Sequence, residues 1–293
     1  PKVDVDAAAT TDEMDALRLI LDESLGNDPQ GPNGLSGALD DVAGTVTVST
    51  NPAAGQAIGR QTMAPDLLDD LFAEGVTADF GTDGEGSRSD VLKFELGGST
   101  NETQLLVTAL QSSDLAGMTA EQRTVSLEVN GDGTVVEGVI PGTAADGDEF
   151  VAFRITLMNP TDPDAAYLVA EQFLPFDHGG SENPSALDEA LDLLMAQGGS
   201  LGLTLTTTLV DGDGDEVSSS ATVPLITDQQ SFVTFEDDGP TVTAQQYGGS
   251  VIHDETPGDD GDADDYAFDD LPAGIKAAFN GVIPAGNDGD VGV

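Results

Sequence analysis

The feature that most constrains the fold is a tract in which two apolar, threonine- and serine-rich stretches flank a turn crowded with aspartate. It runs LTTTLVDGDGDEVSSSATVPLITDQQSFVTFEDDGPTV from Leu205 to Val242. The turn places Asp211, Asp213 and Asp215 at alternate positions, with glycines between them. Carboxylates this close repel one another unless cations lie between them, and Ca²⁺ takes several oxygen ligands from flexible loops. The tract therefore predicts a strand, a calcium-binding turn and a second strand.

Other calcium motifs do not fit this turn. In an EF-hand loop beginning at Asp211, the sixth position would be Glu216 where glycine is required, and the twelfth would be Thr222 where glutamate belongs. Tandem glycine-rich nonapeptides of the β-roll type are also missing from the sequence. The alternative to a metal site is a plain acidic hairpin turn. The all-oxygen cluster favours the metal site.

An internal repeat divides the chain into two units. PKVDVD at residues 1–6 resembles PTVTAQ at residues 240–245, and LILDESLGND at residues 19–28 resembles SVIHDETPGDD at residues 250–260. We therefore expect a complete β-rich module over residues 1–239 and the beginning of a second, similar module with an acidic loop over residues 240–293. On this interpretation the chain is a piece of a longer protein.

A second group of acids lies at the expected junction between these modules. We predict that it binds calcium and stiffens the link, and the alternative is a solvated turn whose proline, Pro240, limits flexibility. The two acidic pairs at equivalent places in the repeat and the pair before Gly239 make up this group. The predicted ligands at the junction are Asp22, Glu23, Asp254, Glu255, Asp237 and Asp238.

The charge of the chain restricts its partners. Its 55 acidic and 8 basic residues give a formal net charge of −47. Without a basic surface to replace phosphate counterions, we expect no binding to nucleic acid or to an anionic membrane, and no apolar run approaches membrane-spanning length. Such a charge opposes compaction, so we expect bound divalent cations, high salt or both to neutralise it. If the acidity is an adaptation to salt alone, monovalent salt should stabilise the fold as well as calcium does.

Short apolar runs between Gly, Asp and Asn turns predict an all-β fold, a β-sandwich-like module with a few short helices, stabilised by calcium. The Asn130-Gly131 pair predicts a hairpin turn with positive φ. The expected strands are Gly44–Thr50, Asp90–Leu96, Thr103–Leu110, Thr124–Val129, Thr134–Ile140, Glu149–Met158, Ala166–Leu174, Leu201–Val210 and Glu216–Ile226. The expected helices are Ser185–Gly198, Pro65–Gly75 and Asp12–Ile20.

Enzymatic chemistry has little support in the sequence. The adjacent residues Asp177 and His178 could act as a general base, but no nucleophile motif accompanies them, and the chain has no cysteine. Sugar hydrolysis is disfavoured because carbohydrate sites usually contain aromatic side chains that pack against the sugar, and the chain has no Trp and only three Tyr. We therefore expect a protein that is not an enzyme. Further acid–glycine turns, at Asp83 and Glu85 and at residues 146–149, suggest either several metal sites or a charged rim.

The string from Val210 to Val242 resembles the closing signature of the type I secretion target repeat domains of giant RTX adhesins of Gram-negative bacteria. FGTDGEGS at residues 80–87, VVEG at residues 135–138 and FDH at residues 176–178 resemble further landmarks of that family, in the same order. The helical opening TTDEMDALRLI departs from the pattern. The resemblance spans most of residues 1–239.

The resemblance implies a secreted, extracellular module at the bacterial cell surface, with a role in cell adhesion and biofilms. It implies a non-enzymatic, Ca²⁺-binding, monomeric unit that extends or scaffolds a ligand-binding domain and has neighbouring modules of the same adhesin as partners. The carboxylates of the two signatures would be metal-associated. The alternative function is a Ca²⁺-dependent module that itself binds sugar or peptide.

Overall fold

The protein was analysed as a computed structural model that describes residues 1–7, 9, 11–22, 48–65, 67–72, 76–109, 115–142, 148–178 and 190–236. The chain divides into two compact units, and all described residues belong to the unit that contains Pro1–Gly239. The predicted second module over residues 240–293 lies outside the described residues and stays a prediction. Within the described residues the fold is all-β, as the sequence predicts, with several sheets and a few short helices.

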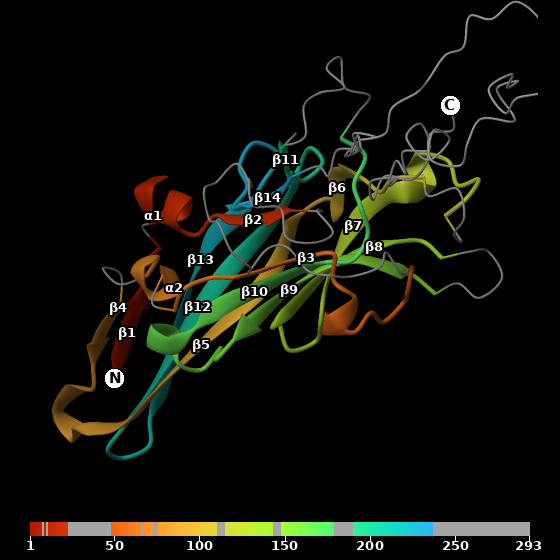
Figure 1. The fold of residues 1–293 in the computed structure, drawn as a ribbon. Helices are drawn as coiled ribbons and strands as arrows, with labels where there is room; N and C mark the ends of the chain where they lie inside the picture. Colours follow the sequence, from red (N-terminus) through yellow and green to blue (C-terminus); the bar gives the residue numbers. More distant parts are fainter. Residues whose placement is uncertain are drawn as a thin grey trace, which may run out of the picture. The chain divides into compact units, whose positions relative to one another are not determined.

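The larger layer is an antiparallel sheet of six strands (Figure 1). Its strands in spatial order are β3 (Gly59–Thr62), β10 (Tyr167–Gln172), β9 (Phe150–Met158), β8 (Val135–Ile140), β7 (Thr124–Val129) and β6 (Glu102–Leu106). Strands β6 to β10 follow one another along the chain, so each hairpin connection is local. β3 joins the far edge through its pairing with β10.

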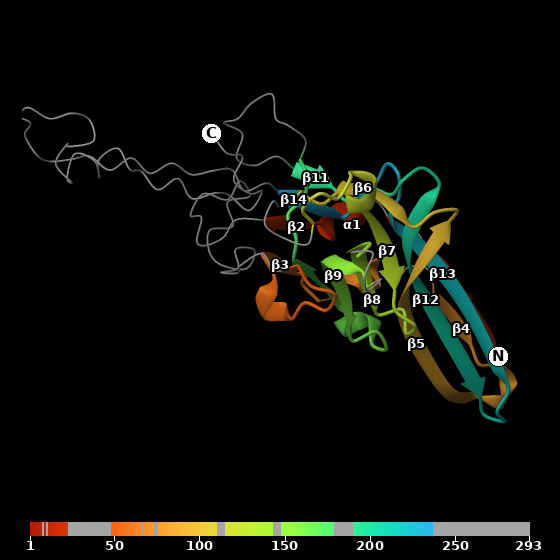
Figure 2. The same ribbon diagram turned by 90° about the vertical axis from the view of Figure 1, so that its right-hand side faces the viewer.

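The second layer, seen beside the first in Figure 2, is a three-stranded sheet of long strands. β12 (Gly199–Asp211) lies in the middle and pairs antiparallel with β5 (Glu85–Gly98) on one side and β13 (Glu216–Ile226) on the other. We refer to this unit as the long sheet. One of its faces is polar, where Thr206 and Thr208 of β12 form hydroxyl hydrogen bonds with serines of β13.

Smaller elements complete the unit. β1 (Lys2–Val5) pairs with β4 (Val76–Asp79), and β14 (Val233–Glu236) lies between β11 (Ala190–Asp192) and β2 (Leu19–Asp22). The helical segments are α1 (Thr11–Ala16), α2 (Leu67–Asp70), η1 (Ala54–Gln56), η2 (Gly81–Asp83), η3 (Glu121–Arg123) and η4 (Pro163–Ala165). In the described part of the chain, no helix is long and apolar enough to cross a membrane.

The main core lies between the layers and contains buried side chains from both sheets. At its centre Phe153 of β9, Phe176 and Phe235 of β14 pack together, with ring centroids 4.5–6.3 Å apart. Aromatic contacts at such separations add to the stabilisation from burial. The buried Leu203 and Leu205 project from β12 toward this core, which fixes the long sheet against the rest of the unit.

The predicted helix Ser185–Gly198 is wrong in its described part. Residues 190–192 form strand β11, where Leu191 pairs with Phe235, and Met195 forms an isolated bridge with Thr103. The apolar positions 191, 193 and 195 alternate, as in a strand, and the side chains of Leu193 and Met195 are fully buried. Tertiary hydrogen bonds, such as that from Leu193 N to Val233 O (3.0 Å), replace those of a helix. Residues 185–189 lie outside the described residues.

Other predictions need smaller corrections. The predicted helix Asp12–Ile20 corresponds to α1, which ends at Ala16, because β2 begins at Leu19. The predicted helix Pro65–Gly75 is confirmed only over the short α2. Residues 48–50 are not in a strand, and the rest of the predicted strand 44–50 lies outside the described residues. The β7–β8 hairpin is confirmed, but positive φ occurs at Gly133 (73°) instead of at the Asn-Gly pair. There Asn130 Oδ1 accepts hydrogen bonds from the backbone N–H of Thr134 and Val135.

Candidate metal centre

The predicted acidic turn joins β12 to β13 at one end of the long sheet. Asp211 ends β12, and its N–H donates to Asp215 O (3.0 Å). Its side chain also closes the turn, because Oδ1 accepts a hydrogen bond from the N–H of Asp215 (2.9 Å). Gly214 has a φ of 97°, a left-handed conformation that a side chain disfavours. The turn is therefore a fixed local structure that presents its carboxylates in a defined place.

A second turn, η2, approaches the first so closely that glycine is required at the contact. Gly212 N donates to Gly84 O (2.9 Å). A Cβ added at Gly212 would lie 2.2 Å from Asp83 O, and one at Gly86 would lie 2.4 Å from Asp211 O. Because both distances are far shorter than any real Cβ contact, only the missing side chains allow the two turns to meet.

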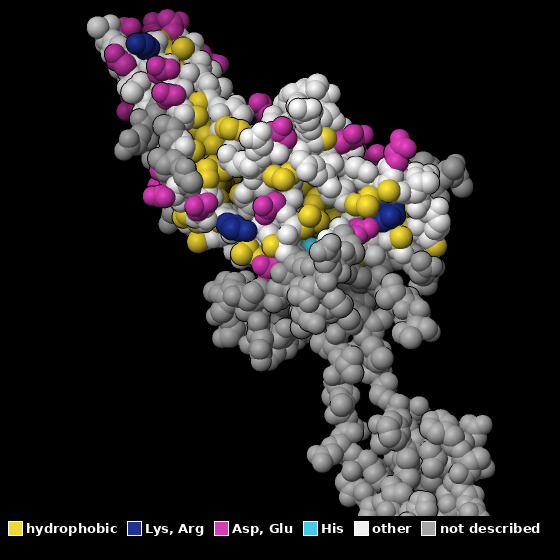
Figure 3. All heavy atoms as spheres, turned by 90° about the horizontal axis from the view of Figure 1, so that it is seen from above, with side chains coloured by type: hydrophobic (Ala, Val, Ile, Leu, Met, Phe, Trp, Pro, Cys, Tyr) yellow, Lys and Arg dark blue, Asp and Glu magenta, His cyan; other side chains and the backbone are white. Residues whose placement is uncertain are grey.

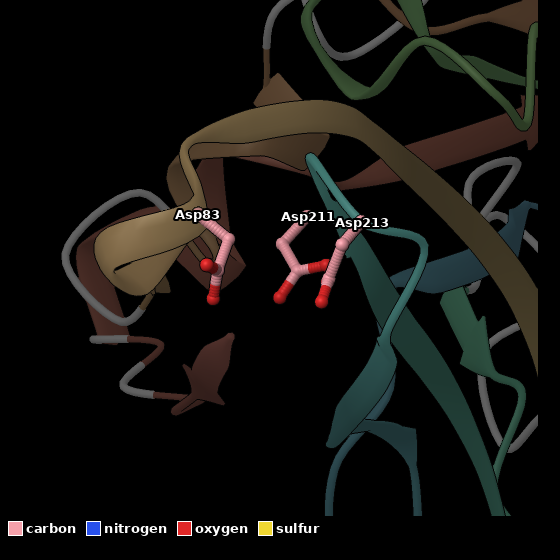
Figure 4. Close-up of side chains that lie close together, drawn as sticks. All are labelled: Asp83, Asp211 and Asp213. Carbon is pink, nitrogen blue, oxygen red and sulfur yellow. The ribbon is translucent and has the colours of Figure 1, made fainter.

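Three carboxylates converge where the turns meet (Figure 4). Asp83 comes from η2, and Asp211 and Asp213 come from the β12–β13 turn; each offers an oxygen within 4.8 Å of the others. Asp211 is buried, with 4% of its surface exposed, whereas the other two side chains are exposed. In Figure 4 the three carboxylates point to the same side of the two turns. We call these three residues the Asp83 cluster.

The electrostatics of the cluster show that its negative charge is incompletely balanced. A hydrogen bond between the side chains of Asp211 and Asp213 lowers the pKa of Asp211 and raises that of Asp213, with repulsion from Asp211 and Asp215 raising the latter further. A bound cation would lie among carboxylates that otherwise repel one another.

The donor set fits a hard cation. Three carboxylates supply oxygen alone, which suits Ca²⁺ or Mg²⁺ better than the transition metals that prefer nitrogen or sulfur. Ca²⁺ usually takes six to eight oxygens and tolerates irregular loops, with water and backbone carbonyls completing its shell. Exposed positions of Asp83 and Asp213 leave room for such waters. The residues present therefore fit a calcium ion in chemistry.

The structure brings together two of the three ligands predicted in the acidic turn. Asp215 is outside the cluster and holds the turn through its backbone N–H and C=O. At the predicted junction, β2 and β14 run parallel and pair Asp22 with Glu236. The backbone of Asp22 is described but its side chain is not. The predicted ligands Glu23, Asp237, Asp238, Asp254 and Glu255 lie outside the described residues.

Asp83 is the residue of the candidate site that the sequence prediction did not place there. Its acid–glycine turn, FGTDGEGS, is noticeable in sequence, but nothing there indicates which distant acid it faces. The other acid–glycine turn, at residues 146–149, is described only in part. Within it, burial raises the pKa of Glu149, and the neighbouring Glu128 raises it further. Asp177 lies 3.9 Å from Arg123 Nη1, so that carboxylate takes part in an ion pair.

Comparison with known proteins gives one match. The family model described as "Domain of unknown function (DUF5801)" matches residues 18–224, a region that contains all three carboxylates of the Asp83 cluster. No curated protein and no solved structure matches the chain. Because the family model covers well over half of the sequence, the chain belongs to the DUF5801 family.

Proposed function

We propose that this chain is a non-enzymatic, calcium-binding structural module of a secreted bacterial adhesin of the RTX type. It would act at the cell surface, where it extends or scaffolds a ligand-binding domain between neighbouring modules of the same protein. The observation that carries the proposal is the Asp83 cluster, in which two turns far apart in sequence converge on a common point. The sequence resemblance to adhesin repeats supplies the biological setting.

Calcium would act on the mechanics of the module. Without a cation, Asp83 repels the buried Asp211, and this repulsion tends to separate η2 from the β12–β13 turn. A divalent ion reverses the sign of the interaction and ties the two turns together at the end of the long sheet. Extracellular calcium modules bind with dissociation constants of about 10⁻⁴–10⁻³ M, so calcium outside the cell would keep such a site filled.

Charge elsewhere on the chain is consistent with this role. On the face drawn in Figure 3, acidic side chains are widespread and lysine and arginine are few. Any cation that screens this charge should therefore stabilise the folded state. The proposal needs a test that separates binding at a specific site from general screening. The test is a comparison of calcium with salts at equal ionic strength.

Thermal unfolding provides that test. We expect saturating Ca²⁺ to raise the melting temperature of the protein by about 3–6 °C over the value in EDTA, because the ion binds only the folded state. Mg²⁺ should do less, since it keeps its waters, and NaCl at equal ionic strength should do less still. Equal gains from NaCl and Ca²⁺ would contradict the proposal and leave screening as the explanation.

A matched pair of variants localises the effect. The variant Asp83→Asn/Asp213→Asn should lose the calcium-dependent gain, and in EDTA it should melt no lower than the unmodified protein because repulsion is relieved. The control Asp12→Asn/Asp132→Asn removes the same charge from exposed positions in α1 and the β7–β8 turn. It should keep the full calcium response.

A further inference from the structure

A cavity of about 520 Å³ lies on the core side of the long sheet, away from the Asp83 cluster. It is bounded by α2, by β4 and β5, by Leu205 of β12 and by the segment Thr161–Asp164 that includes the start of η4. Its apolar lining comes mainly from Phe72, Val76 and Leu205. The size is typical of cavities that take a small organic ligand, about 300–1,000 Å³.

The cavity is also strongly acidic. Its lining carries four aspartates and a single basic residue, Arg88. Arg88 is already engaged, because its Nε donates to Asp90 Oδ2 (2.8 Å), while Thr207 Oγ1 donates to Asp90 Oδ1 (2.6 Å). The ion pairs among the described residues do not include the other three aspartates. Those three are Asp69, Asp162 and Asp164.

The uncompensated charge is felt within the cavity. The pKa of Asp69 is raised by burial first and by the neighbouring carboxylates Asp164 and Asp70 next, whereas Arg88 opposes the shift. A cation placed here would be attracted by each carboxylate and repelled by Arg88. Apolar side chains thus line the same hollow as carboxylates without an ion pair, of which Asp162 and Asp164 are exposed and Asp69 is half-buried. This combination sets the chemistry of an occupant.

We propose that this cavity binds an organic cation, a primary ammonium or guanidinium group carried on a short apolar stem. The charged group would lie among Asp69, Asp162 and Asp164, and the stem would lie against Phe72, Val76 and Leu205. A single metal ion fits less well, because among the described residues only the Asp83 cluster gathers three ligand atoms within 4.8 Å. Such a group occurs on free polyamines and on the lysine or arginine side chains of peptides. The inference does not depend on the proposed calcium role.

Calorimetric titration of the calcium-saturated protein at about 0.15 M ionic strength tests the site. The probes are spermidine, for the free polyamines, and acetyl-lysine amide, for a peptide side chain. We expect saturable binding of at least one probe to the folded protein, and tighter binding of one or the other identifies the source. Absence of saturable binding by both probes would overturn the proposal.

Two pairs of variants separate a built site from attraction to an acidic protein. Asp69→Asn/Asp164→Asn should weaken binding about fivefold, and the equally charged control Asp12→Asn/Asp132→Asn should leave it unchanged. Arg88→Gln should strengthen binding several-fold, because it frees Asp90, whereas Lys93→Gln removes a cation from the opposite face of β5 and should have no effect. Equal effects within either pair would overturn the proposal, and each variant's melting temperature shows whether it is folded.

Discussion

At the scale of single residues, Gly212 allows the two turns of the Asp83 cluster to approach closely. Its φ is not positive, so its role is one of space and not of backbone conformation. The backbone carbonyl of Asp83 occupies the position that a side chain at 212 would need. The distance between the two acidic turns therefore depends on an absent methyl group.

Replacement of this glycine tests that dependence. Gly212→Ala should destabilise the protein by about 1–3 kcal/mol through overpacking, and it should also reduce the calcium-dependent rise in melting temperature, because Asp83 is displaced from Asp211. Melting curves in EDTA and in Ca²⁺ measure both effects. The control is Gly131→Ala, since a Cβ at Gly131 would meet nothing within 4 Å. An unaltered calcium response in Gly212→Ala would show that the contact does not position the ligands.

Asp83 also marks the limit of sequence prediction for the site. Asp211 and Asp213 could be predicted because ligands on one turn are neighbours in the chain, and their spacing alone suggests a shared ion. Asp83 reaches them through the pairing of β5 with β12, which places Glu85 opposite Asp211. Register of this kind is set by long-range packing, and a single sequence does not reveal it.

At the scale of elements, strands with strong alternation could be predicted and short ones could not. β12 and β13 are long, and their apolar residues alternate with threonine and serine, so their pattern is clear in sequence. By contrast, β3 has the sequence GRQT, and its extended conformation comes from pairing with β10. The helix prediction is wrong over the described residues 190–198 for the same reason, because contacts with β14 outweigh local helix propensity there.

A prediction about pH follows from Glu128 of β7 and Glu149, which directly precedes β9. Burial and the charge of Glu128 raise the pKa of Glu149 above its ordinary value of 4.5. Between that value and the raised one, the folded state holds a proton that the unfolded state lacks, so the free energy of unfolding falls as pH rises. Glu149→Gln should therefore stabilise the protein at neutral pH and have little effect at pH below the ordinary value. Denaturant unfolding across this pH range measures it.

A charge control accompanies this prediction. Glu121→Gln removes one negative charge from the exposed η3 and should leave the pH dependence of unfolding as it is. If both variants flatten the pH dependence equally, the cause is the net charge of the chain and not the contact between Glu149 and Glu128.

At the scale of the whole molecule, a net charge of −47 makes repulsion a property of the entire surface. The pattern of apolar runs and turns predicts the all-β class, whereas the charge follows from composition alone. Composition could not separate screening from site binding, since sodium and calcium both reduce repulsion. The two contributions differ in where they act.

This difference gives a prediction for monovalent salt. Raising NaCl from about 0.15 M to about 1 M shortens the Debye length from about 8 Å to about 3 Å, so the melting temperature should rise. The rise should be equal in the unmodified protein and in Asp83→Asn/Asp213→Asn, as measured by calorimetry in EDTA. A variant that no longer responds to NaCl would indicate that sodium occupies the cluster itself.

The parallel pairing of β2 with β14 has a consequence for the order in which the module can form. β14 is the last described strand, yet it lies between β2 and β11 and supplies Phe235 to the central aromatic group. A chain that is made or exported from its beginning therefore lacks the middle of its core until residue 235 has emerged. Until then the core is incomplete, and repulsion among the carboxylates favours an extended chain over a compact one.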